Sequence, residues 1–487
     1  MSESSTSGVQ PSGEEGLRQR ASRGTLFSLS GQVGQQFLRL ASNLILARLL
    51  FPEAFGIMAI IYMVVFALEQ FSNIGIPSAV MRYEHGDQSR FLDTAWTIQV
   101  LRGFLLWFIG LAVTPTVAAF YDMPQLRELL PVATFAAVLL GFQSTHFHVL
   151  TRRLMLGRRV AIEVIARVVS ILLMVTMAWI QPSIWALVYG GLANYLVLVI
   201  LSHVWIPGPR VRLSWDRAVV AEVFSLGKWV FASSGLSFAL AQIDVALLGK
   251  LVDGETLGIY SQSAQVPMVL RDVGFIILSS VVAPIVAESN REGSAVLRAR
   301  YASIRRLILP AALLLGLGAM VAAPAFFEFL YDERYRDASW MAQLGLVRSW
   351  FAFMQVAGCI SLLSLGDGRS WVISNIVGLV GVSGGCLVGF ELGGMHGLLI
   401  GMGAGSALGV VAPAVQLWRI GVANPGSEIR YTLLGATLVA WTWIVVEVSA
   451  DWVPLGDSMR MLIVGSIALA PYALWTGLRI IREFRFR

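Results

Sequence analysis

Long apolar runs recur from one end of the chain to the other, and they constrain its fold more than any other feature. A helix needs about 20 apolar residues to cross a bilayer, and about fourteen such stretches can be placed in the 487 residues. Only 14% of the residues are charged, against roughly 25% in a soluble domain. The sequence therefore predicts an all-α polytopic membrane protein with about 14 transmembrane helices and no sizeable soluble domain.

Basic residues concentrate in alternate connections between the apolar runs. With the N-terminus placed in the cytoplasm, the inner connections and termini hold 24 Lys and Arg residues and the outer connections hold 6. Cytoplasmic segments of membrane proteins carry such an excess of Lys and Arg, so we expect an even number of spans and both termini in the cytoplasm. This distribution accounts for most of the net charge of +6, which therefore does not indicate nucleic-acid binding.

The end of the first expected span is repeated at the end of the seventh. The segment from Arg48 to Ile57 aligns without gaps with the segment from Lys250 to Ile259, and the two share Leu, Glu, Gly and Ile at equivalent positions. Both copies run from the inside to the outside. The sequence therefore predicts two parallel six-helix repeats related by a pseudo-two-fold axis, an arrangement found in transporters.

These features predict the domain organisation. We expect a disordered cytoplasmic tail at 1–23, an N-lobe of spans 1–6 at 24–206, a cytoplasmic inter-lobe elbow at 207–220, a C-lobe of spans 7–12 at 221–419, two extra helices at 430–478 and a basic cytoplasmic tail at 479–487. Residues 215–222 of the elbow region have the pattern of an amphipathic segment on the inner membrane surface. Glycines at every fourth residue of the eleventh and twelfth spans predict close helix packing rather than binding.

Four polar side chains share one face of the first span. They are Gln32, Gln36, Arg39 and Asn43, at steps of four, three and four residues. Residues at such steps lie on the same side of a helix. A guanidinium inside a membrane is costly unless it faces other protein or a wet cavity, so we predict that this face lines a substrate cavity.

Six basic and four acidic residues fall inside the expected spans. The cations are Arg39, Arg102, Arg167, Lys228, Arg271 and Arg348, and the acids are Glu69, Glu163, Asp244 and Asp272. Each cation could bind an anionic ligand or pair with an acid. Pairing is favoured for Arg167, because Glu163 precedes it by four residues on the same helical face. Both alternatives stay open for Lys228 and Arg348.

Arg39 and Arg102 are the best candidates for ligand binding, since neither has an acid three or four residues away. Arg271 need not pair with Asp272, because neighbouring residues of a helix point in different directions. The predicted substrate cavity comprises Gln32, Gln36, Arg39, Asn43, Arg102, Lys228, Arg271 and Arg348.

Intramembrane carboxylates can carry a coupling proton or sodium ion. Asp244 and Asp272 are the candidates for this role, and a structural pairing of Asp244 with an arginine is equally open. Neither cysteine, at 359 or 386, has the spacing of a metal site. The chain contains no Gly-x-x-x-x-Gly-Lys-Ser/Thr phosphate-binding loop, so we expect no cofactor, no metal and no nucleotide hydrolysis.

Several short motifs surround the two repeated segments. Asp244 is followed by Gly249, then by Leu-Gly-Ile-Tyr-Ser from Leu257 and by Ala-Gln-Val-Pro from Ala264. The sequence Leu-Leu-Phe-Pro-Glu-Ala-Phe-Gly ends at Gly56, and Ser-Ile-Trp-Ala-Leu-Val-Tyr-Gly occupies 183–190. This combination resembles the polysaccharide-transport (Wzx-type, WzxC-like) flippases of the multidrug/oligosaccharidyl-lipid/polysaccharide exporter superfamily. The resemblance implies a V-shaped bundle of two lobes in the bacterial inner membrane.

The resemblance also implies a function. A flippase of this type would translocate undecaprenyl-diphosphate-linked oligosaccharide repeat units for exopolysaccharide or lipopolysaccharide biosynthesis by alternating access. Arginines suit this cargo, because a guanidinium can hold a phosphate through two parallel hydrogen bonds. The expected partners are the lipid-linked oligosaccharide and membrane lipids; polymerase and chain-length proteins of a polysaccharide export system could join them, whereas nucleic acid is not expected.

Two alternatives keep the fold and change the cargo: a cation-coupled multidrug exporter and a peptidoglycan lipid-precursor flippase. A drug exporter would favour carboxylates and aromatic side chains for organic cations, whereas six cations and four acids lie in the spans here. A membrane enzyme would need a large extramembrane catalytic loop, and the outer connections such as 122–128 and 331–339 are short. We therefore expect a transporter and not an enzyme.

Overall fold

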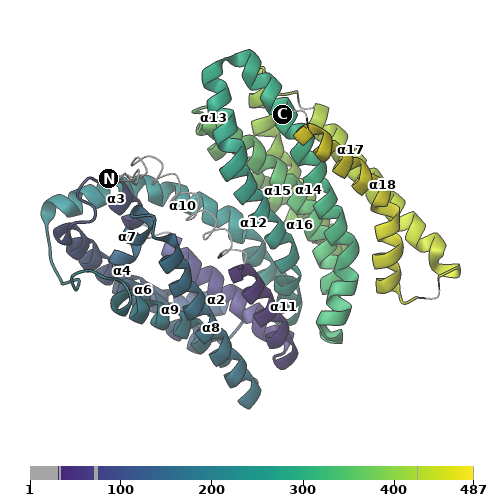
Figure 1. The fold of residues 1–487 in the computed structure, drawn as a ribbon. Helices are drawn as coiled ribbons and strands as arrows, with labels where there is room; N and C mark the ends of the chain where they lie inside the picture. The colour runs from purple at the N-terminus through teal and green to yellow at the C-terminus, as the bar shows by residue number, and fades with distance from the viewer. Residues whose placement is uncertain (1–30, 32–33, 71–74, 425, 454, 486–487) are drawn as a thin grey trace, which may run out of the picture. The chain divides into compact units, whose positions relative to one another are not determined.

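The computed structural model of the chain is a set of helices joined by mostly short connections (Figure 1). It describes residues 31, 34–70, 75–424, 426–453 and 455–485, of which 224–234, 236–237, 451 and 483–485 are described by their backbone alone. No strand occurs among these residues. Residues divide by their contacts into unit 1, which comprises 1–49 and 64–235, and unit 2, which comprises 50–63 and 236–487.

Unit 1 contains one helix at residues 34–49 and most of the helices up to residue 235. They are the end of α2 (Pro52–Gln70), α3 (Ile76–Arg82), α4 (Ser89–Phe120), α5 (Leu126–Thr134), α6 (Ala136–Gly141), α7 (His146–Arg152), α8 (Leu156–Ile180), α9 (Trp185–Val204) and the start of α10 (Arg217–Leu251). One buried apolar cluster joins α3, α4, α7 and α10 through residues such as Val80, Phe91 and Val223.

Unit 2 contains the start of α2, the end of α10 and everything that follows. Its other elements are α11 (Gly254–Ser263), α12 (Gln265–Ile277), the π-helical turn η1 (Leu278–Val282), α13 (Ala283–Glu292), α14 (Ser294–Leu330), η2 (Glu333–Tyr335), α15 (Ala338–Ser364), α16 (Arg369–Arg419), α17 (Gly426–Val448), η3 (Ser449–Asp451) and α18 (Asp457–Arg485). A buried cluster joins η1, α13, α14, α15 and α16 through residues such as Val282, Tyr301 and Leu362.

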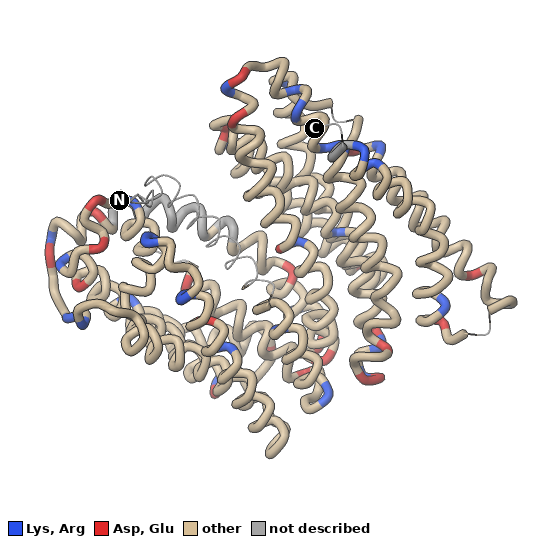
Figure 2. The backbone as a smooth tube through the Cα atoms, viewed as in Figure 1, with Lys and Arg blue, Asp and Glu red and all other residues tan. Residues whose placement is uncertain are grey.

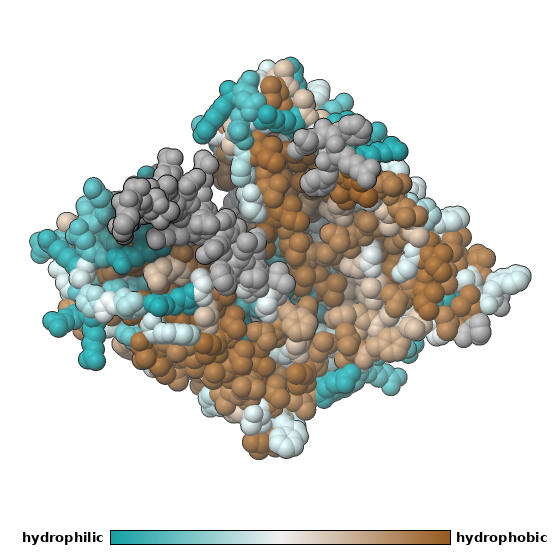
Figure 3. Space-filling view, in the orientation of Figure 1, coloured by the Kyte–Doolittle hydropathy of each residue, from teal (hydrophilic) through white to brown (hydrophobic). Residues whose placement is uncertain are grey.

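The surface has the polarity of a membrane protein. Charged residues gather at helix ends and connections and are sparse within the helices (Figure 2). On the face shown in Figure 3, apolar side chains cover the flanks of the helices. Many of them are large and exposed, such as Phe108 at 58% and Val388 at 61%. Exposed apolar surface on this scale is stable only against lipid.

Ten described helices are long and apolar enough to cross a membrane, and the bent pair 126–141 and 146–152 raises the number to eleven. α16 is 51 residues long, but Gly393 and Gly394 within it have non-helical backbone angles. They lie at the expected boundary between the eleventh and twelfth spans, so α16 contains both of these spans. The all-α, multi-pass prediction is confirmed, and the exact count of fourteen stays a prediction.

The two halves of α16 cross at their glycines. A methyl group on Gly385 would lie 2.0 Å from the carbonyl oxygen of Gly401, and one on Gly389 would lie 2.1 Å from that of Gly397. Real Cβ atoms are not found at such distances, so only glycine allows this approach. The glycines at every fourth residue thus allow close helix packing, as predicted from the sequence.

The repeated segments of the sequence also lie against each other, within unit 2. A methyl group on Gly56 of α2 would lie 2.0 Å from the carbonyl oxygen of Gly254, and one on Gly258 of α11 would lie 1.8 Å from that of Pro52. In the sequence alignment Pro52 corresponds to Gly254 and Gly56 to Gly258. The contact is therefore reciprocal, as a pseudo-two-fold relation between the two copies requires.

Candidate functional site

Unit 1 contains a polar cavity of about 240 Å³ inside its bundle of helices. It is lined by Glu69 and Gln70 of α2, Ile76 and Pro77 of α3, Gln99, Arg102, Gly103 and Leu106 of α4, Ala137, Leu140 and Gly141 of α6, Gln143, and His148 of α7. Charged, amide and imidazole groups thus meet in a region made from apolar spans. Such groups are retained inside a membrane protein mainly where a ligand, ion or proton is handled.

Arg102 is the cation of this cavity. Its Nη2 donates a hydrogen bond to the backbone carbonyl oxygen of Glu69 at 3.1 Å, and the Glu69 side chain lines the same cavity. A guanidinium carries five N–H donors in a planar fork. Arg102 therefore adds a positive charge and a fork of N–H donors to a cavity that also contains the Glu69 carboxylate.

A broken span forms one wall of the cavity. The segment 126–141 bends by 63° into α7, and this break exposes backbone carbonyl groups inside the unit. The Nε2 of Gln99 lies 2.9 Å from the carbonyl oxygen of Leu140, 3.3 Å from that of Gly141 and 3.0 Å from that of Gln143. Gln99 is only 8% exposed. Its buried amide, which comes from the neighbouring helix α4, thus provides hydrogen-bond donors to the carbonyl groups at the break. Substrate sites of transporters are typically built at such discontinuous helices.

Small residues and a turn place the remaining walls. A methyl group on Gly103 would lie 2.6 Å from the carbonyl oxygen of Ala137, so α4 and α6 approach closely only because this residue is glycine. Gly75 has φ 70°, in the left-handed region, and Pro77 lies in the first turn of α3. This combination starts α3 sharply and turns Ile76 and Pro77 toward the cavity.

The polar stripe of the first span is described in part. Gln32 lies outside the described residues, while Gln36, Arg39 and Asn43 belong to the helix at 34–49 and are each half-buried. The neighbouring Gln35 donates from Nε2 to Glu163 of α8 at 3.0 Å, which attaches this helix to unit 1. The stripe as a cavity lining stays a prediction.

Asp244 and Arg348 form an ion pair inside unit 2. Nη1 of Arg348 on α15 lies 2.9 Å from Oδ2 of Asp244 on α10, and the hydroxyl of Tyr260 on α11 donates to the same oxygen at 2.9 Å. The side chains of Arg348 and Asp244 are 21% and 16% exposed. Pairing was the alternative left open for both residues, and here one carboxylate ties three helices together.

Arg271 lines a second, apolar cavity in unit 2. This cavity has a volume of about 580 Å³ and is formed by α12, α14, α15 and α17. Nε of Arg271 lies 3.8 Å from Oδ1 of Asp272, and both side chains are nearly half exposed, so this exposed pair is weak. The side chain of Lys228 lies outside the described residues.

Glu163 does not pair with Arg167. It accepts instead from Nε of Arg159 at 3.0 Å, while Nη1 of Arg159 also donates to Thr151 at 2.7 Å. Arg159 is four residues before Glu163 and Arg167 is four residues after it, so helical spacing allows either pair. The additional contact with Thr151 in α7 favours Arg159, and the pairing expected for Arg167 was wrong.

The sequence pattern missed part of the polar cavity. It singled out Arg102, noted Glu69 only as an intramembrane acid, and left a contact with a sugar or phosphate open for His148, although it favoured an interfacial placement. Gln99 and Gln143 contribute further polar groups. The only signal for Gln99 in the sequence was an amide in the middle of an apolar span. This signal did not reveal that the amide bonds the carbonyl groups of a broken helix.

Comparison with protein families decides the classification. The family model described as a polysaccharide biosynthesis protein matches residues 45–340, which is more than half of the chain. The chain belongs to this family. The match includes all the motifs that carried the resemblance, from Leu49 to Pro267, and it confirms that resemblance.

Relatives of this family with assigned names are distant. The chain is 21% identical over 271 residues to the teichuronic acid biosynthesis protein TuaB of Bacillus subtilis (strain 168), covering 55% of each chain. It is 24% identical over 260 residues to the succinoglycan biosynthesis transport protein ExoT of Rhizobium meliloti (strain 1021), covering 53% of this chain and 51% of ExoT. The matches thus span about half the length of these curated relatives.

Solved structures with a similar fold are membrane transporters. The lipid II flippase MurJ in an inward closed conformation superposes with a TM-score of 0.71 at 11% identity, covering 95% of this chain and 100% of MurJ. An inward-facing multidrug resistance MATE family transporter of the MOP superfamily gives 0.60 at 15% identity, covering 83% of this chain and 96% of the transporter. At these identities the similarity shows the fold alone, and it is the fold of a multi-pass membrane transporter.

Proposed function

We propose that this protein is an inner-membrane flippase that moves undecaprenyl-diphosphate-linked oligosaccharide repeat units from the cytoplasmic to the periplasmic leaflet. The glycan would serve exopolysaccharide or lipopolysaccharide biosynthesis. Family membership and the transport protein ExoT among the relatives support this class of cargo. In this proposal both termini are cytoplasmic, no covalent chemistry takes place, and a polymerase and chain-length proteins receive the cargo.

The observation that carries the proposal is the placement of Arg102 in the polar cavity of unit 1. A diphosphate needs cationic donors, and sugar hydroxyls need groups that both donate and accept. Arg102 supplies the former, and Gln143 and His148 belong to the latter kind. At about 240 Å³ the cavity is smaller than the 300–1,000 Å³ typical of drug-sized ligands, so it suits a diphosphate or one sugar, with the rest of the head outside it.

The proposed mechanism is alternating access. The arginine would bind the diphosphate head while the prenyl chain stays in the bilayer, and movement of the helical repeats would then expose the head on the outer side. Electrostatic attraction to the arginine is stronger here than in water, because the surrounding spans have a low dielectric constant. Arg39 and Arg271, two of the intramembrane cations predicted from the sequence, are proposed as further contacts along the path.

The test is complementation of a bacterial strain that lacks its exopolysaccharide flippase and accumulates the lipid-linked repeat unit inside. Wild-type protein, Arg102→Gln and the control Arg127→Gln, which alters an exposed arginine in the first turn of α5, are produced at equal levels. We expect wild type and Arg127→Gln to restore surface polymer and outer-leaflet intermediate, and Arg102→Gln to lower both at least tenfold.

Two outcomes would contradict the proposal at different points. Equal export by Arg102→Gln and wild type would remove Arg102 from the path and leave the flippase function standing. If wild type fails with several glycan types but lowers the accumulation of a cationic dye, the cation-coupled multidrug exporter replaces our proposal.

A further inference from the structure

Residues 207–216, which we call the strap, connect α9 to α10 within unit 1 and form no helix. The backbone N–H of Arg212 donates to the carboxylate of Asp93 at 3.0 Å, and that of Ser214 donates to the hydroxyl of Thr97 at 2.9 Å. Asp93 and Thr97 lie in the first turns of α4. Two N–H groups two residues apart thus bond one helix, as expected for an extended segment whose side chains alternate between two sides.

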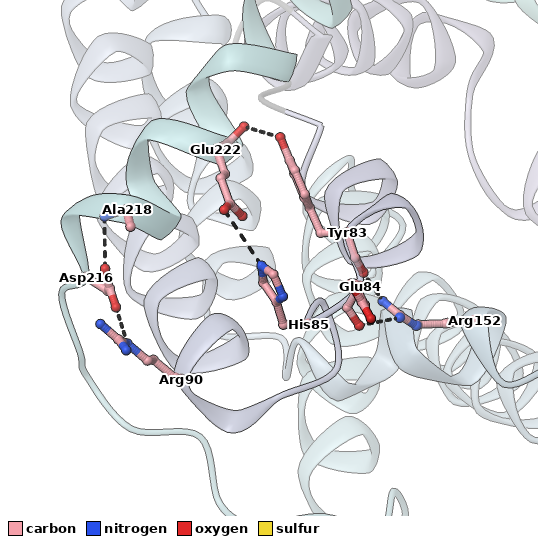
Figure 4. Close-up of polar contacts among 8 residues, drawn as sticks. All are labelled: Tyr83, Glu84, His85, Arg90, Arg152, Asp216, Ala218 and Glu222. Carbon is pink, nitrogen blue, oxygen red and sulfur yellow. Dashed lines mark hydrogen bonds and ion pairs between the residues drawn. The ribbon is translucent and has the colours of Figure 1, made fainter.

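The strap leads directly into α10, and polar contacts fix the junction. The carboxylate of Asp216 accepts from the backbone N–H of Ala218 at 2.9 Å and forms an ion pair with Arg90 (Figure 4). These two contacts hold the pKa of Asp216 below its usual value, so the residue stays anionic. A hydrogen bond from Tyr83 to the Glu222 carbonyl at 3.1 Å attaches the next turn of α10 to the same part of unit 1.

One side of the strap is apolar and unusually exposed. Leu213 is 71% and Trp215 is 58% exposed, and their spacing of two residues places them on the same side. Arg210, Arg212 and Arg217 are exposed next to them. Leu and Trp interleaved with arginines are typical of segments that lie in the interface of an anionic membrane.

We propose that the strap binds the anionic inner leaflet, with Leu213 and Trp215 inserted at the boundary of headgroups and acyl chains and with Arg210 and Arg212 against lipid phosphates. The excess of basic residues in the inner connections places this end of α4 on the cytoplasmic side. The inference rests on this cytoplasmic placement and on no other part of the proposed function.

The consequence of this contact concerns α10. Its residues 217–235 belong to unit 1 and residues 236–251 to unit 2. A leaflet that holds the strap also holds the first turns of this helix, through Asp216. Lipid bound to the strap would therefore lie directly before α10, a helix with residues in both units.

The direct test is the immersion depth of a nitroxide label at Leu213→Cys in the full chain. Both native cysteines are buried, so the new thiol is labelled selectively, and the protein is reconstituted in phosphatidylcholine vesicles with or without phosphatidylglycerol. Labels at Gln125→Cys, in an exposed connection, and at Phe108→Cys, on an exposed flank of α4, calibrate water and hydrocarbon. We expect the label at 213 to lie about 5–10 Å below the lipid phosphates, and deeper with phosphatidylglycerol.

A second variant tests the phosphate contact. Arg210→Gln combined with Arg212→Gln keeps the backbone bonds of the strap and should abolish the deepening caused by phosphatidylglycerol, whereas Arg127→Gln should leave it intact. A label at 213 as accessible to water as the label at 125 would overturn the proposal. Equal depth in both kinds of vesicle would overturn its anionic-lipid part. Neither measurement depends on transport, so failure of the flippase function would not produce these results.

Discussion

Asp244 and Arg348 form an ion pair in unit 2. From this pair we predict how substitutions of the two residues change the free energy of unfolding. Removing one member of a fully buried ion pair leaves an uncompensated charge and costs about 3–5 kcal/mol, whereas replacing both can be neutral. This pair is 16–21% exposed, so its cost should lie toward the lower end of that range. Arg348→Met should therefore lower the free energy of unfolding strongly, and adding Asp244→Asn should recover most of the loss. Unfolding in mixed micelles with increasing SDS measures both variants. A double variant no more stable than Arg348→Met would show that the two residues are not coupled.

Single residues also show where prediction from sequence stops. Arg102 could be identified as a candidate ligand-binding residue because no acid lies three or four residues from it in the sequence. The sequence could not show whether Glu163 pairs with Arg159 or with Arg167, because both lie four residues from it. The pairing with Arg159 is favoured by the contact of Arg159 with Thr151 in another helix. Local spacing predicts which pairs are possible, and tertiary contacts select among them.

At the scale of elements, the broken span of unit 1 depends on a residue from a neighbouring helix. We predict that Gln99→Leu increases hydrogen exchange at the amides of 140–148 and lowers the stability of the protein by about 1–3 kcal/mol, because buried carbonyl groups lose their donor. The matched control is Gln343→Leu, which removes a buried amide with a single bond to Met320 at 3.1 Å. Exchange near residue 142 that rises equally in both variants would argue against a specific role of Gln99.

The contact between the starts of α2 and α11 is a second feature of this scale. Gly258→Ala would place a methyl group 1.8 Å from the Pro52 carbonyl oxygen, whereas nothing lies within 4 Å of a methyl group on Gly316. We expect Gly258→Ala to destabilise the protein by about 1–3 kcal/mol, as overpacking does, and Gly316→Ala to be nearly neutral. Thermal unfolding of the two purified variants makes the comparison. Equal midpoints would mean that the helices separate there at little cost.

For the whole molecule, apolar run length and the distribution of arginines were enough to predict a multi-pass helical membrane protein, because these features follow from the bilayer itself. The prediction of a transporter needed the internal repeat and the motif resemblance as well. The candidate site was harder to predict. Its lining residues come from α2, α3, α4, α6 and α7 and from the break at Gln143, and no local pattern brings Glu69, Gln99 and His148 together. Each helix can be predicted from its own segment of the sequence, whereas a cavity depends on how several segments pack together.

The reciprocal contact of Gly56 with Gly254 and of Gly258 with Pro52 has the symmetry of a homodimer interface, although it lies in one polypeptide. In a true homodimer every mutation appears twice, so both sides of such an interface change together. Here a single codon alters one side alone. Proline at 52 and glycine at the equivalent position 254 are an example of such a one-sided difference. Each side of this contact can therefore change independently of the other, within the limit that the close approach at Gly56 and Gly258 admits no side chain.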